Sequence, residues 1–405
     1  MSLDPPAPDL VVVGGGVIGL AVAWRVRQRG LSVTVLERGV VGEDCACGVA
    51  AGMLAPVSEV EFGDAGKCML ELGVRSARLW PGFAAELDEA LATAEPAAGG
   101  ANGCTAGPGV LAPRDVGLRR SGTLLVARDT DEARELERQL ALRESLGLSV
   151  TRLRPSAARE LEPALAPTIR LALEAPEDHS VDPRRVLAAL RCACELAGVQ
   201  LREHAPVARV ETEGAHARVT GLTLADGSRV HAARVVLAAG AWTGEIEGLP
   251  AHARVAVRPV KGQILRLRDP DGPGLLERVL RFEGGYLVPR GDGGYVLGAT
   301  VEERGFEREP TARGVYELLR DARELVPGVL ELQIEELSVG FRPATPDNVP
   351  AVGLGALPGL LWATGHHRNG ILLAPLTAEL LANVLVDAET DGNSIGACCG
   401  EVAST

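Results

Sequence analysis

The N-terminal segment places a glycine-rich turn and a helix between two short strands. Leu10–Val13 is apolar and mostly β-branched, and the run Gly14–Gly19 follows it directly. The apolar segment Leu20–Gln28 is typical of a helix, and a second strand, Ser32–Leu36, ends beside Glu37. This order predicts a βαβ unit, which commits the chain to a parallel sheet covered by helices.

The glycines of this turn match the spacing Gly-x-Gly-x-x-Gly of dinucleotide-binding proteins. Gly14 permits the tight turn, Gly16 lets a pyrophosphate approach the backbone, and Gly19 lets the helix pack close to the strand. Glu37 stands near the ~20-residue spacing at which an acid binds the ribose hydroxyls. The pattern predicts dinucleotide binding and, by itself, leaves NAD and FAD both open.

Composition narrows the class of protein. A chain of 405 residues suffices for two or three domains, and its 46% hydrophobic content is too high for a disordered chain. The net charge of −13 argues against nucleic acid and anionic membranes as partners. The N-terminus lacks the basic start of a signal peptide, and the glycine-interrupted stretch Leu10–Trp24 is shorter than the ~20 residues of a membrane span. We therefore expect a cytoplasmic protein without a membrane span.

The cysteines do not have the spacing of a metal or redox site. Cys45 and Cys47, like Cys192 and Cys194, are separated by one residue, whereas zinc and thioredoxin-type sites use Cys-x-x-Cys. If Cys192 and Cys194 lie on a helix, their side chains point to different faces and cannot share one metal. We expect structural or inert thiols and no metal site.

Helical and strand patterns alternate along the rest of the chain. Asp182 and Pro183 are typical of the N-cap and first position of a helix reaching Ala197, and Asp226-Gly227 is typical of a hairpin turn. Further helices are expected at 57–91, 131–146, 316–325 and 371–385, and strands at 122–127, 207–210, 218–224, 229–231, 234–240, 263–267, 285–289, 294–300 and 360–365. The Ala-, Gly- and Pro-rich segment 92–113 is expected to be an exposed loop, and the residues from about 387 a loose tail.

Blocks along nearly the whole chain resemble the FAD-dependent amine and amino-acid oxidases. The most specific are Gly340–Asp347 (GFRPATPD) and Ala363–Pro375 (ATGHHRNGILLAP). The others are Ala50–Pro56, Val181–Pro183, Val235–Trp242, Pro259–Gln263, Tyr286–Arg290 and Gly298–Glu303. Together they make the chain similar to the glycine oxidases associated with thiamine thiazole synthesis, within the D-amino-acid oxidase and sarcosine oxidase group.

The resemblance implies an α/β fold with two domains. A discontinuous, Rossmann-like FAD-binding domain would have a mostly parallel sheet, and a substrate domain would have a large antiparallel sheet. The expected ranges are 1–90, 168–250 and 335–388 for the FAD-binding domain, 91–167 and 251–334 for the substrate domain, and 389–405 for a C-terminal tail.

The resemblance also implies which residues contact the cofactor. Beyond the glycine turn, these are Val17, Ile18, Glu37, Arg38, Ala51, Gly52, Met53, Val207, His366, His367, Arg368, Asn369, Gly370, Ile371 and Leu372. We expect non-covalent FAD, because the loop at 366–372 carries histidines and lacks the cysteine that holds flavin in related sarcosine oxidases. The segment Cys45–Gly48 departs from the Thr or Ser of similar proteins, which implies that a hydroxyl contact to the flavin phosphates would be replaced by backbone N–H groups. Val301 stands where one member of this branch has an active-site methionine, so the size of the pocket is left open.

Three residues are expected at the substrate. Arg342 would grip both oxygens of a substrate carboxylate, because a planar guanidinium matches that geometry; the plainer interpretation is a loop arginine. Tyr286 would add a phenolic hydrogen bond or simply pack across a sheet. Arg368 would close the pocket or face the flavin where negative charge develops, or be an unrelated loop cation. Lys261 is interpreted as an edge-strand lysine in preference to a group that assists oxygen.

The expected activity is FAD-dependent oxidative deamination of glycine by hydride transfer to flavin N5. The products would be an imine that yields glyoxylate and ammonia, with hydrogen peroxide released when oxygen reoxidises the flavin. Sarcosine and small D-amino acids such as D-alanine remain alternative substrates, and a nicotinamide-dependent dehydrogenase and a non-catalytic flavin-bound subunit remain alternative classes. We also expect a homo-oligomer that can hand its imine to a thiazole synthase.

Overall fold

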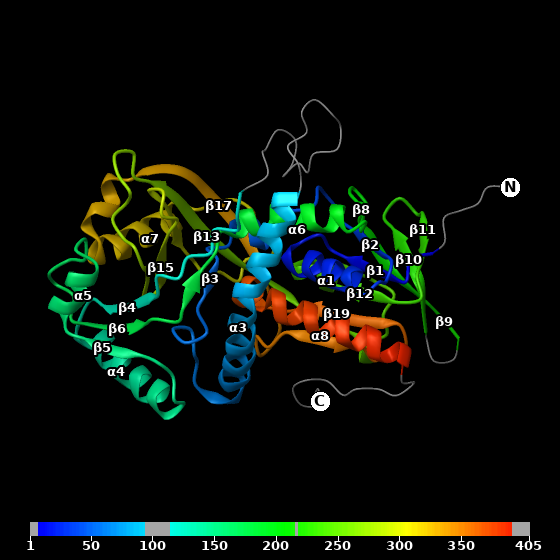
Figure 1. Ribbon diagram of the computed structural model, residues 1–405, viewed down its shortest axis with the longest axis horizontal. Coiled ribbons are helices and arrows are strands. Elements are labelled where there is room, and N and C mark those ends of the chain that lie inside the picture. The colour runs from blue at the N-terminus through cyan, green and yellow to red at the C-terminus, as the bar shows by residue number, and fades with distance from the viewer. Residues whose placement is uncertain (1–6, 94–113, 215–217, 391–405) are drawn as a thin grey trace.

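The computed structural model describes residues 7–93, 114–214 and 218–390, which form two main sheets with their helices side by side (Figure 1). The six-stranded sheet lies in the half of Figure 1 that holds α1 (Val17–Gln28), and the eight-stranded sheet lies in the half that holds α7 (Ala312–Leu325). The long helix α3 (Gly63–Thr93) runs between the two halves. The expected mixed α/β architecture is confirmed.

The six-stranded sheet is parallel except at one edge. Its order is β18 (Ala351–Leu354), β19 (Leu360–Thr364), β12 (Val235–Leu237), β1 (Leu10–Val13), β2 (Val33–Leu36) and β8 (Gln200–Arg202). Only the β18–β19 pair is antiparallel. Because β1, α1 and β2 follow one another in the chain and β1 pairs with β2 in parallel, the predicted βαβ unit is confirmed.

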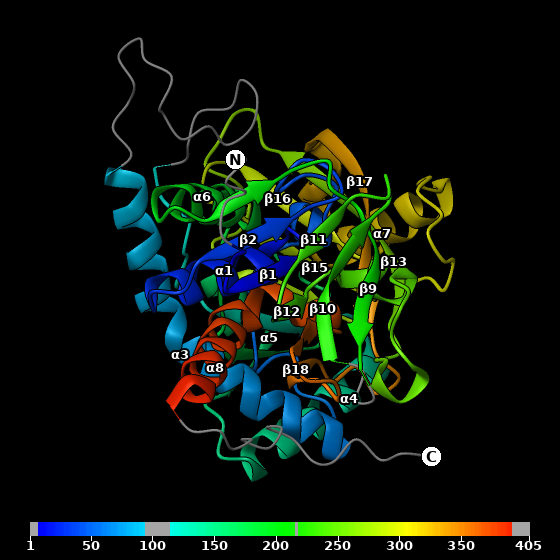
Figure 2. The ribbon, with the colours of Figure 1, turned by 90° about the vertical axis from the view of Figure 1, so that its right-hand side faces the viewer.

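Alternate residues of β1 enter two different cores, since successive side chains of a strand point to opposite faces. Leu10 and Val12 pack with α1, α6 (Pro183–Leu196) and α8 (Gly370–Thr390). Val11 and Val13 pack with a small antiparallel sheet whose order is β11 (Arg229–His231), β10 (Arg218–Leu224) and β9 (Val207–Glu213). Figure 2 shows the helices on one side of the parallel sheet and β9–β11 on the other.

The eight-stranded sheet is antiparallel apart from one pair. Its order is β17 (Gln333–Ala344), β13 (Arg258–Arg268), β16 (Gly294–Gly298), β15 (Gly285–Pro289), β14 (Val279–Phe282), β4 (Thr123–Ala127), β6 (Leu171–Ala175) and β5 (Thr151–Leu153). Only β14 and β4 pair in parallel. The domain ranges expected from the sequence stay a proposal, and we amend them by placing β6 and β17 with the substrate domain, because both strands pair within this sheet.

The two faces of the eight-stranded sheet have different neighbours. One face packs against α7 and α5 (Pro155–Leu161). The opposite face packs against α4 (Thr130–Ser145) at one end of the sheet, and near its middle Ile264 and Val288 pack against residues 49–53 of the other unit. The cleft between the units therefore opens where this second face meets the chain that follows β2.

Local sequence signals explain several helix starts. The Asp182 carboxylate accepts from the backbone N–H groups of Arg184 (2.9 Å) and Arg185 (3.4 Å), and Pro183 is the first residue of α6, as predicted. Asp129 caps α4 in the same way. The remaining short elements are α2 (Ala46–Val49), the two-stranded sheet β3 (Met53–Leu54) with β7 (His179–Ser180), and 3-10 turns at Gly240–Glu245, Ala251–Ala253, Pro327–Glu331 and His367–Asn369.

The expected helix at 57–91 begins later than predicted, at Gly63. The N–H groups of Val57 and Ser58 donate to the buried Asp178 carboxylate over 3.1 and 2.5 Å, and the Arg143 guanidinium binds both of their carbonyls. These long-range partners replace the helical hydrogen bonds of the segment, and burial raises the pKa of Asp178 to about 6.

The chain near the C-terminus is helical further than predicted. α8 continues to Thr390. It therefore extends past Leu385, the expected end of the helix, and past residue 387, where the tail was expected to start. His367–Val386 is long and apolar enough to cross a membrane, but most of its apolar window is buried inside the fold, where α8 packs against α1 and α3. It is a core helix. Most of the expected loop at 92–113, and the residues after 390, lie outside the described residues.

Candidate active site

A cavity of about 580 Å³ lies between the two units. This volume falls within the ~300–1,000 Å³ of cofactor and small-molecule sites. All the residues that the sequence suggested for the cofactor and substrate line this cavity, apart from Gly19 and Leu372.

The two exceptions have structural roles. A Cβ at Gly19 would lie 1.9 Å from the Gly14 carbonyl oxygen and 3.4 Å from Val12 Cγ1, so its missing side chain lets α1 pack close to β1, as predicted. The Leu372 carbonyl accepts from Ser76 Oγ (2.6 Å) and Trp80 Nε1 (2.9 Å), which ties α8 to α3.

The glycine turn fits a pyrophosphate. Gly14 adopts φ +111°, and a Cβ there would lie 2.5 Å from the Ala238 carbonyl oxygen. Gly16 is the N-cap of α1 and its position carries no side-chain cap, so N–H groups at the helix start face the cavity. The Val17 N–H donates to Cys47 Sγ (3.4 Å).

The acid after β2 stiffens this turn. Glu37 accepts from the N–H groups of Gly15 (2.6 Å) and Gly39 (3.1 Å) while lining the cavity. The next residue, Arg38, stacks on the Trp242 ring with 3.4 Å between its guanidinium carbon and the ring centroid. Trp242 belongs to a block that the sequence singled out, but its role beside Arg38 went unrecognised.

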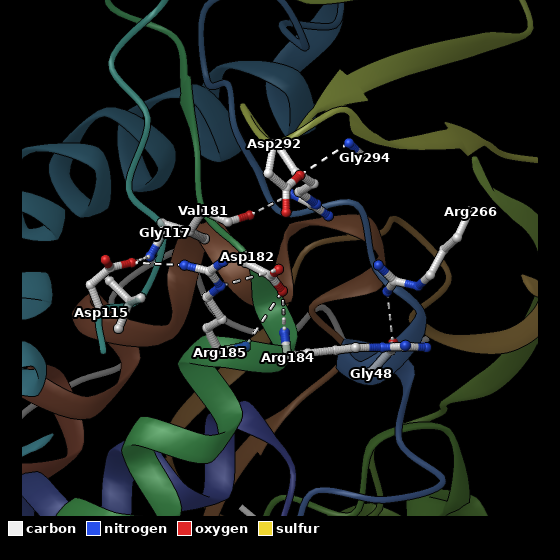
Figure 3. Close-up of polar contacts among 12 residues, drawn as sticks. Gly48, Asp115, Gly117, Val181, Asp182, Arg184, Arg185, Arg266, Asp292 and Gly294 are labelled. Carbon is white, nitrogen blue, oxygen red and sulfur yellow. Dashed lines mark hydrogen bonds and ion pairs between the residues drawn. The ribbon is translucent and has the colours of Figure 1, made fainter. Parts of the chain in front are cut away.

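Arginines from several elements bind backbone carbonyls of the segment 48–51, most of which lines the cavity. The Gly48 carbonyl accepts from Arg184 Nε (2.9 Å) and Arg266 Nη2 (3.2 Å), and Figure 3 shows both side chains reaching it. Arg290 Nη2 donates to the Ala51 carbonyl (2.8 Å), and burial lowers the pKa of Arg290 to about 10. The bonds of Arg266 and Arg290 connect the eight-stranded sheet to this segment, and the bond of Arg184 connects it to α6.

His366 of the C-terminal block is buried and His367 is partly buried, and both have lowered pKa values. His366 Nε2 lies 3.0 Å from Thr377 Oγ1, and burial lowers the pKa of His366 to about 3. His367 has φ +46°, and burial, helped by the charges of Arg342 and Arg368, lowers its pKa to about 4. Across the described ranges no group of three or more His, Cys, Asp or Glu side chains could hold a metal ion.

Arg342 presents an unneutralised guanidinium to the cavity. Its Nη1 donates only to backbone carbonyls, those of Thr300 (3.0 Å) and Lys261 (3.4 Å). Among the described residues no carboxylate lies within ion-pair distance of it. A Cβ at Gly262 would lie 2.5 Å from Arg342 Nη1, so the arginine rests directly on the backbone of β13.

The Tyr286 side chain packs directly over a second glycine, Gly298. A Cβ at Gly298 would lie 2.7 Å from Tyr286 Oη, and burial raises the pKa of Tyr286 while the Arg342 charge opposes that effect. Arg342 and Tyr286, two of the three expected substrate residues, therefore lie on the cavity face of the eight-stranded sheet, next to glycines that lack side chains.

Arg368 differs from Arg342 because its charge is balanced. Its Nε lies 2.8 Å from Glu59 Oε2 and its Nη2 lies 2.6 Å from Glu61 Oε1. The Glu59 charge raises the pKa of Arg368 above its ordinary value. Glu59 also forms an ion pair with Arg281 (3.5 Å). Burial alone would raise the pKa of Glu59, but the charges of Arg368 and Arg281 outweigh it and hold this pKa below its usual range. Sequence reasoning missed Glu59 and Arg281, which lie in no recognisable pattern.

The interpretation of Lys261 as an edge-strand lysine is wrong. β13 lies between β17 and β16, and Lys261 is fully buried. Its Nζ donates to the Glu309 carbonyl (2.7 Å) and lies 3.7 Å from Glu307, so it anchors the segment 301–311 and does not line the cavity. Val301, in the same segment, lines the cavity but is 71% exposed.

The family model described as FAD dependent oxidoreductase matches residues 9–384 of the chain. The chain is 36% identical over 387 residues to a bifunctional protein ThiO/ThiG of Trichormus variabilis, which covers 95% of this chain and 53% of that protein. It is 34% identical over 388 residues to a glycine oxidase of Geobacillus kaustophilus, which covers 94% of each. The chain thus spans about half the length of the first relative and nearly all of the second.

Solved structures resemble the same fold. The glycine oxidase structure from Geobacillus kaustophilus matches with a TM-score of 0.82 at 32% identity, covering 95% of both chains. An iminodiacetate oxidase structure from Chelativorans sp. matches with a TM-score of 0.78 at 26% identity, covering 93% of this chain and 95% of that one.

Proposed function

The chain belongs to the FAD dependent oxidoreductase family, and from this premise we propose that it is a glycine oxidase. It would convert glycine to an imine and then to glyoxylate and ammonia, with oxygen reduced to hydrogen peroxide. The observation that carries the proposal is Arg342, a guanidinium that lines the cavity and has no carboxylate within ion-pair distance in the described part of the chain.

The charges at the substrate end support a small monocarboxylate. Arg281 and Arg368 are matched by Glu59 and Glu61, which leaves Arg342 as the excess positive charge of this group. One carboxylate with a neutral amine would balance it. A substrate with two carboxylates would need a second available cation, so this balance favours glycine over an iminodiacetate-like substrate.

The protein would contribute positioning and electrostatics. When bound, FAD supplies the acceptor for a hydride leaving the substrate Cα. Arg342 would grip the carboxylate and Tyr286 would donate its phenolic hydrogen to the same group, which together fix the direction of the Cα–H bond. Glu59 and Glu61 would hold Arg368 at the pocket wall.

The histidines are poor candidates for a general base. His366 and His367 have pKa values of about 3 and about 4, too low to compete for the proton of a substrate ammonium group. The substrate amine would therefore lose its proton to solvent before hydride transfer, and activity would rise with pH as the neutral amine becomes populated.

Several finer points belong to the same proposal. FAD would be held non-covalently, oxygen would be the electron acceptor, and the protein would be a cytoplasmic homo-oligomer. Release of the imine to a thiazole synthase is suggested by the relative named ThiO/ThiG, of which this chain spans about half. Sarcosine and D-alanine remain the second candidate substrates, because the exposed Val301 leaves room at the cavity wall.

Substrate comparison tests the proposal. Oxygen uptake by the purified holoenzyme should be measured with glycine, sarcosine, D-alanine and iminodiacetate, together with peroxide, ammonia and glyoxylate. We expect the highest kcat/KM with glycine and equal amounts of the three products. Higher kcat/KM with iminodiacetate would contradict the charge argument, and no oxygen uptake with any amino acid would contradict the function.

A further inference from the structure

Two thiols lie in contact inside the cofactor cavity. Cys45 Sγ and Cys47 Sγ are 2.9 Å apart, and both residues line the cavity. Cys45 Sγ is also placed to donate to the Gly42 carbonyl (3.5 Å), and Cys47 Sγ accepts the Val17 N–H at the start of α1 (3.4 Å). The proposed mechanism uses neither sulfur.

The two sulfurs have different surroundings. The hydrogen bond between them lowers the pKa of Cys47 and raises that of Cys45, and the N–H of Val17 further favours the Cys47 thiolate. Cys47 is therefore the better nucleophile, and Cys45 is a protonated thiol in contact with it.

We propose that Cys45 and Cys47 form a peroxide-reducing thiol pair that closes to a disulfide at the cofactor cavity. The Cys47 thiolate attacks one oxygen of hydrogen peroxide, the O–O bond breaks, and a sulfenic acid forms as hydroxide leaves and is protonated to water. Cys45 sulfur then attacks the sulfenic sulfur, the S–O bond breaks, and a second water leaves. Two thiols are oxidised and one peroxide is reduced to two waters.

The location gives this pair a source of oxidant. Hydrogen peroxide is a product of the proposed reaction, and the inference rests on that proposal only for this source. A disulfide across one intervening residue closes a very small ring, and strained disulfides are reduced readily. A dithiol reductant therefore restores the pair, which makes the oxidation reversible.

Peptide mass measurement provides a direct test. The tryptic peptide Gly39–Lys67 contains Cys45 and Cys47 and no other cysteine. After brief treatment of the holoenzyme with equimolar hydrogen peroxide and then alkylation, this peptide should lose two hydrogen atoms and carry no alkyl group. Dithiothreitol should restore double alkylation. The adjacent peptide 68–75, whose Cys68 does not line the cavity, is the internal reference and should stay alkylated.

Two variants assign the roles of the sulfurs. Cys45→Ser should stop the reaction at a sulfenic acid on Cys47 that dimedone traps, whereas Cys47→Ser should oxidise at least tenfold more slowly. Full alkylation of both cysteines after peroxide would overturn the proposal, as would equal rates in the two variants.

A second arm separates this inference from the proposed function. Glycine and oxygen should close the same disulfide without added peroxide, and catalase should slow its formation. If added peroxide closes the disulfide but glycine releases no peroxide, the thiol pair stands and the glycine oxidase proposal fails. Peroxide release from glycine with an unchanged peptide would overturn the thiol pair alone.

Discussion

Replacing Arg342 with alanine removes the cation on which the proposed substrate binding depends. The guanidinium has no carboxylate partner within the part of the chain that the structure describes, and its neighbours are the carbonyls of Thr300 and Lys261. Folding therefore depends little on its charge. We expect the variant to keep its FAD and its thermal stability, and to lose both substrate binding and the orientation of the Cα–H bond.

The size of the effect follows from leaving a buried carboxylate unpaired. Removing one partner of a buried ion pair costs about 3–5 kcal/mol, which corresponds to a roughly 10²- to 10⁴-fold loss in kcat/KM. Both kcat and KM should change, because the same two-point grip binds and aligns the substrate. Arg342→Lys keeps the charge but not the planar fork, so it should recover only part of the loss.

Steady-state oxygen uptake with glycine gives these values, and flavin absorbance gives the FAD content. Arg323→Ala is a matched control, since Arg323 is an exposed arginine of α7 that does not line the cavity. Arg368→Ala tests the other expected substrate cation, whose charge Glu59 and Glu61 already balance. Activity of Arg342→Ala within tenfold of the parent, with a larger loss in Arg368→Ala, would refute the reasoning.

Three further predictions concern other residues. Gly262→Ala places a Cβ 2.5 Å from Arg342 Nη1, so it should raise the KM for glycine at least tenfold. In a variant that already carries Arg342→Ala, the same change should cause little further loss of kcat/KM. Additive losses in the double variant would show that Gly262 acts independently of Arg342. Glu37→Ala removes the acceptor of the Gly15 N–H, a charged hydrogen bond worth about 1.5–3 kcal/mol, so dialysis should yield partly apo protein. A variant that keeps its full FAD content would count against placing the cofactor at the glycine turn. The pKa values of His366 and His367 are lowered from 6.5 to about 3 and about 4, so their contribution to stability is present above pH 6.5 and is lost as pH falls through those values. Urea unfolding between about pH 7 and 4 should therefore show a smaller loss of stability in the variant with both histidines replaced by Gln. The pH profile of kcat/KM for that variant should still follow the substrate amine.

The N-terminal unit could be predicted because its determinants are local. The turn at 14–19 and the acid at 37 lie within one βαβ unit, and their spacing alone implies which groups face a dinucleotide. The N-cap Asp182 is predictable for the same reason, since a cap acts on residues two and three positions later.

The missed features depend on partners far apart in the chain. Asp178 holds the N–H groups of Val57 and Ser58, more than a hundred residues away, and so delays the start of α3. Glu59 and Arg281 meet at the cavity from similarly distant segments. Hydrophobic periodicity and turn signals report only near neighbours, so neither pairing has a signature in the sequence.

The sheet position of Lys261 was misjudged for a related reason. Its neighbour β17 carries charged and exposed residues over its first half and was not recognised as a strand, which made β13 look like an edge. The blocks that place Arg342 and Tyr286 came from the family resemblance. That Arg342 lacks a carboxylate partner while Arg368 has two became apparent only from the assembled sheet and loops.

Anaerobic addition of glycine to the purified holoenzyme tests the central claim most directly. If glycine is the substrate, the visible absorbance of oxidised FAD should bleach within the turnover time and return on admission of oxygen, with one peroxide formed per flavin. Arg342→Ala should bleach far more slowly at the same glycine concentration. A spectrum that stays oxidised with glycine, sarcosine and D-alanine alike would contradict amino-acid oxidation at this site.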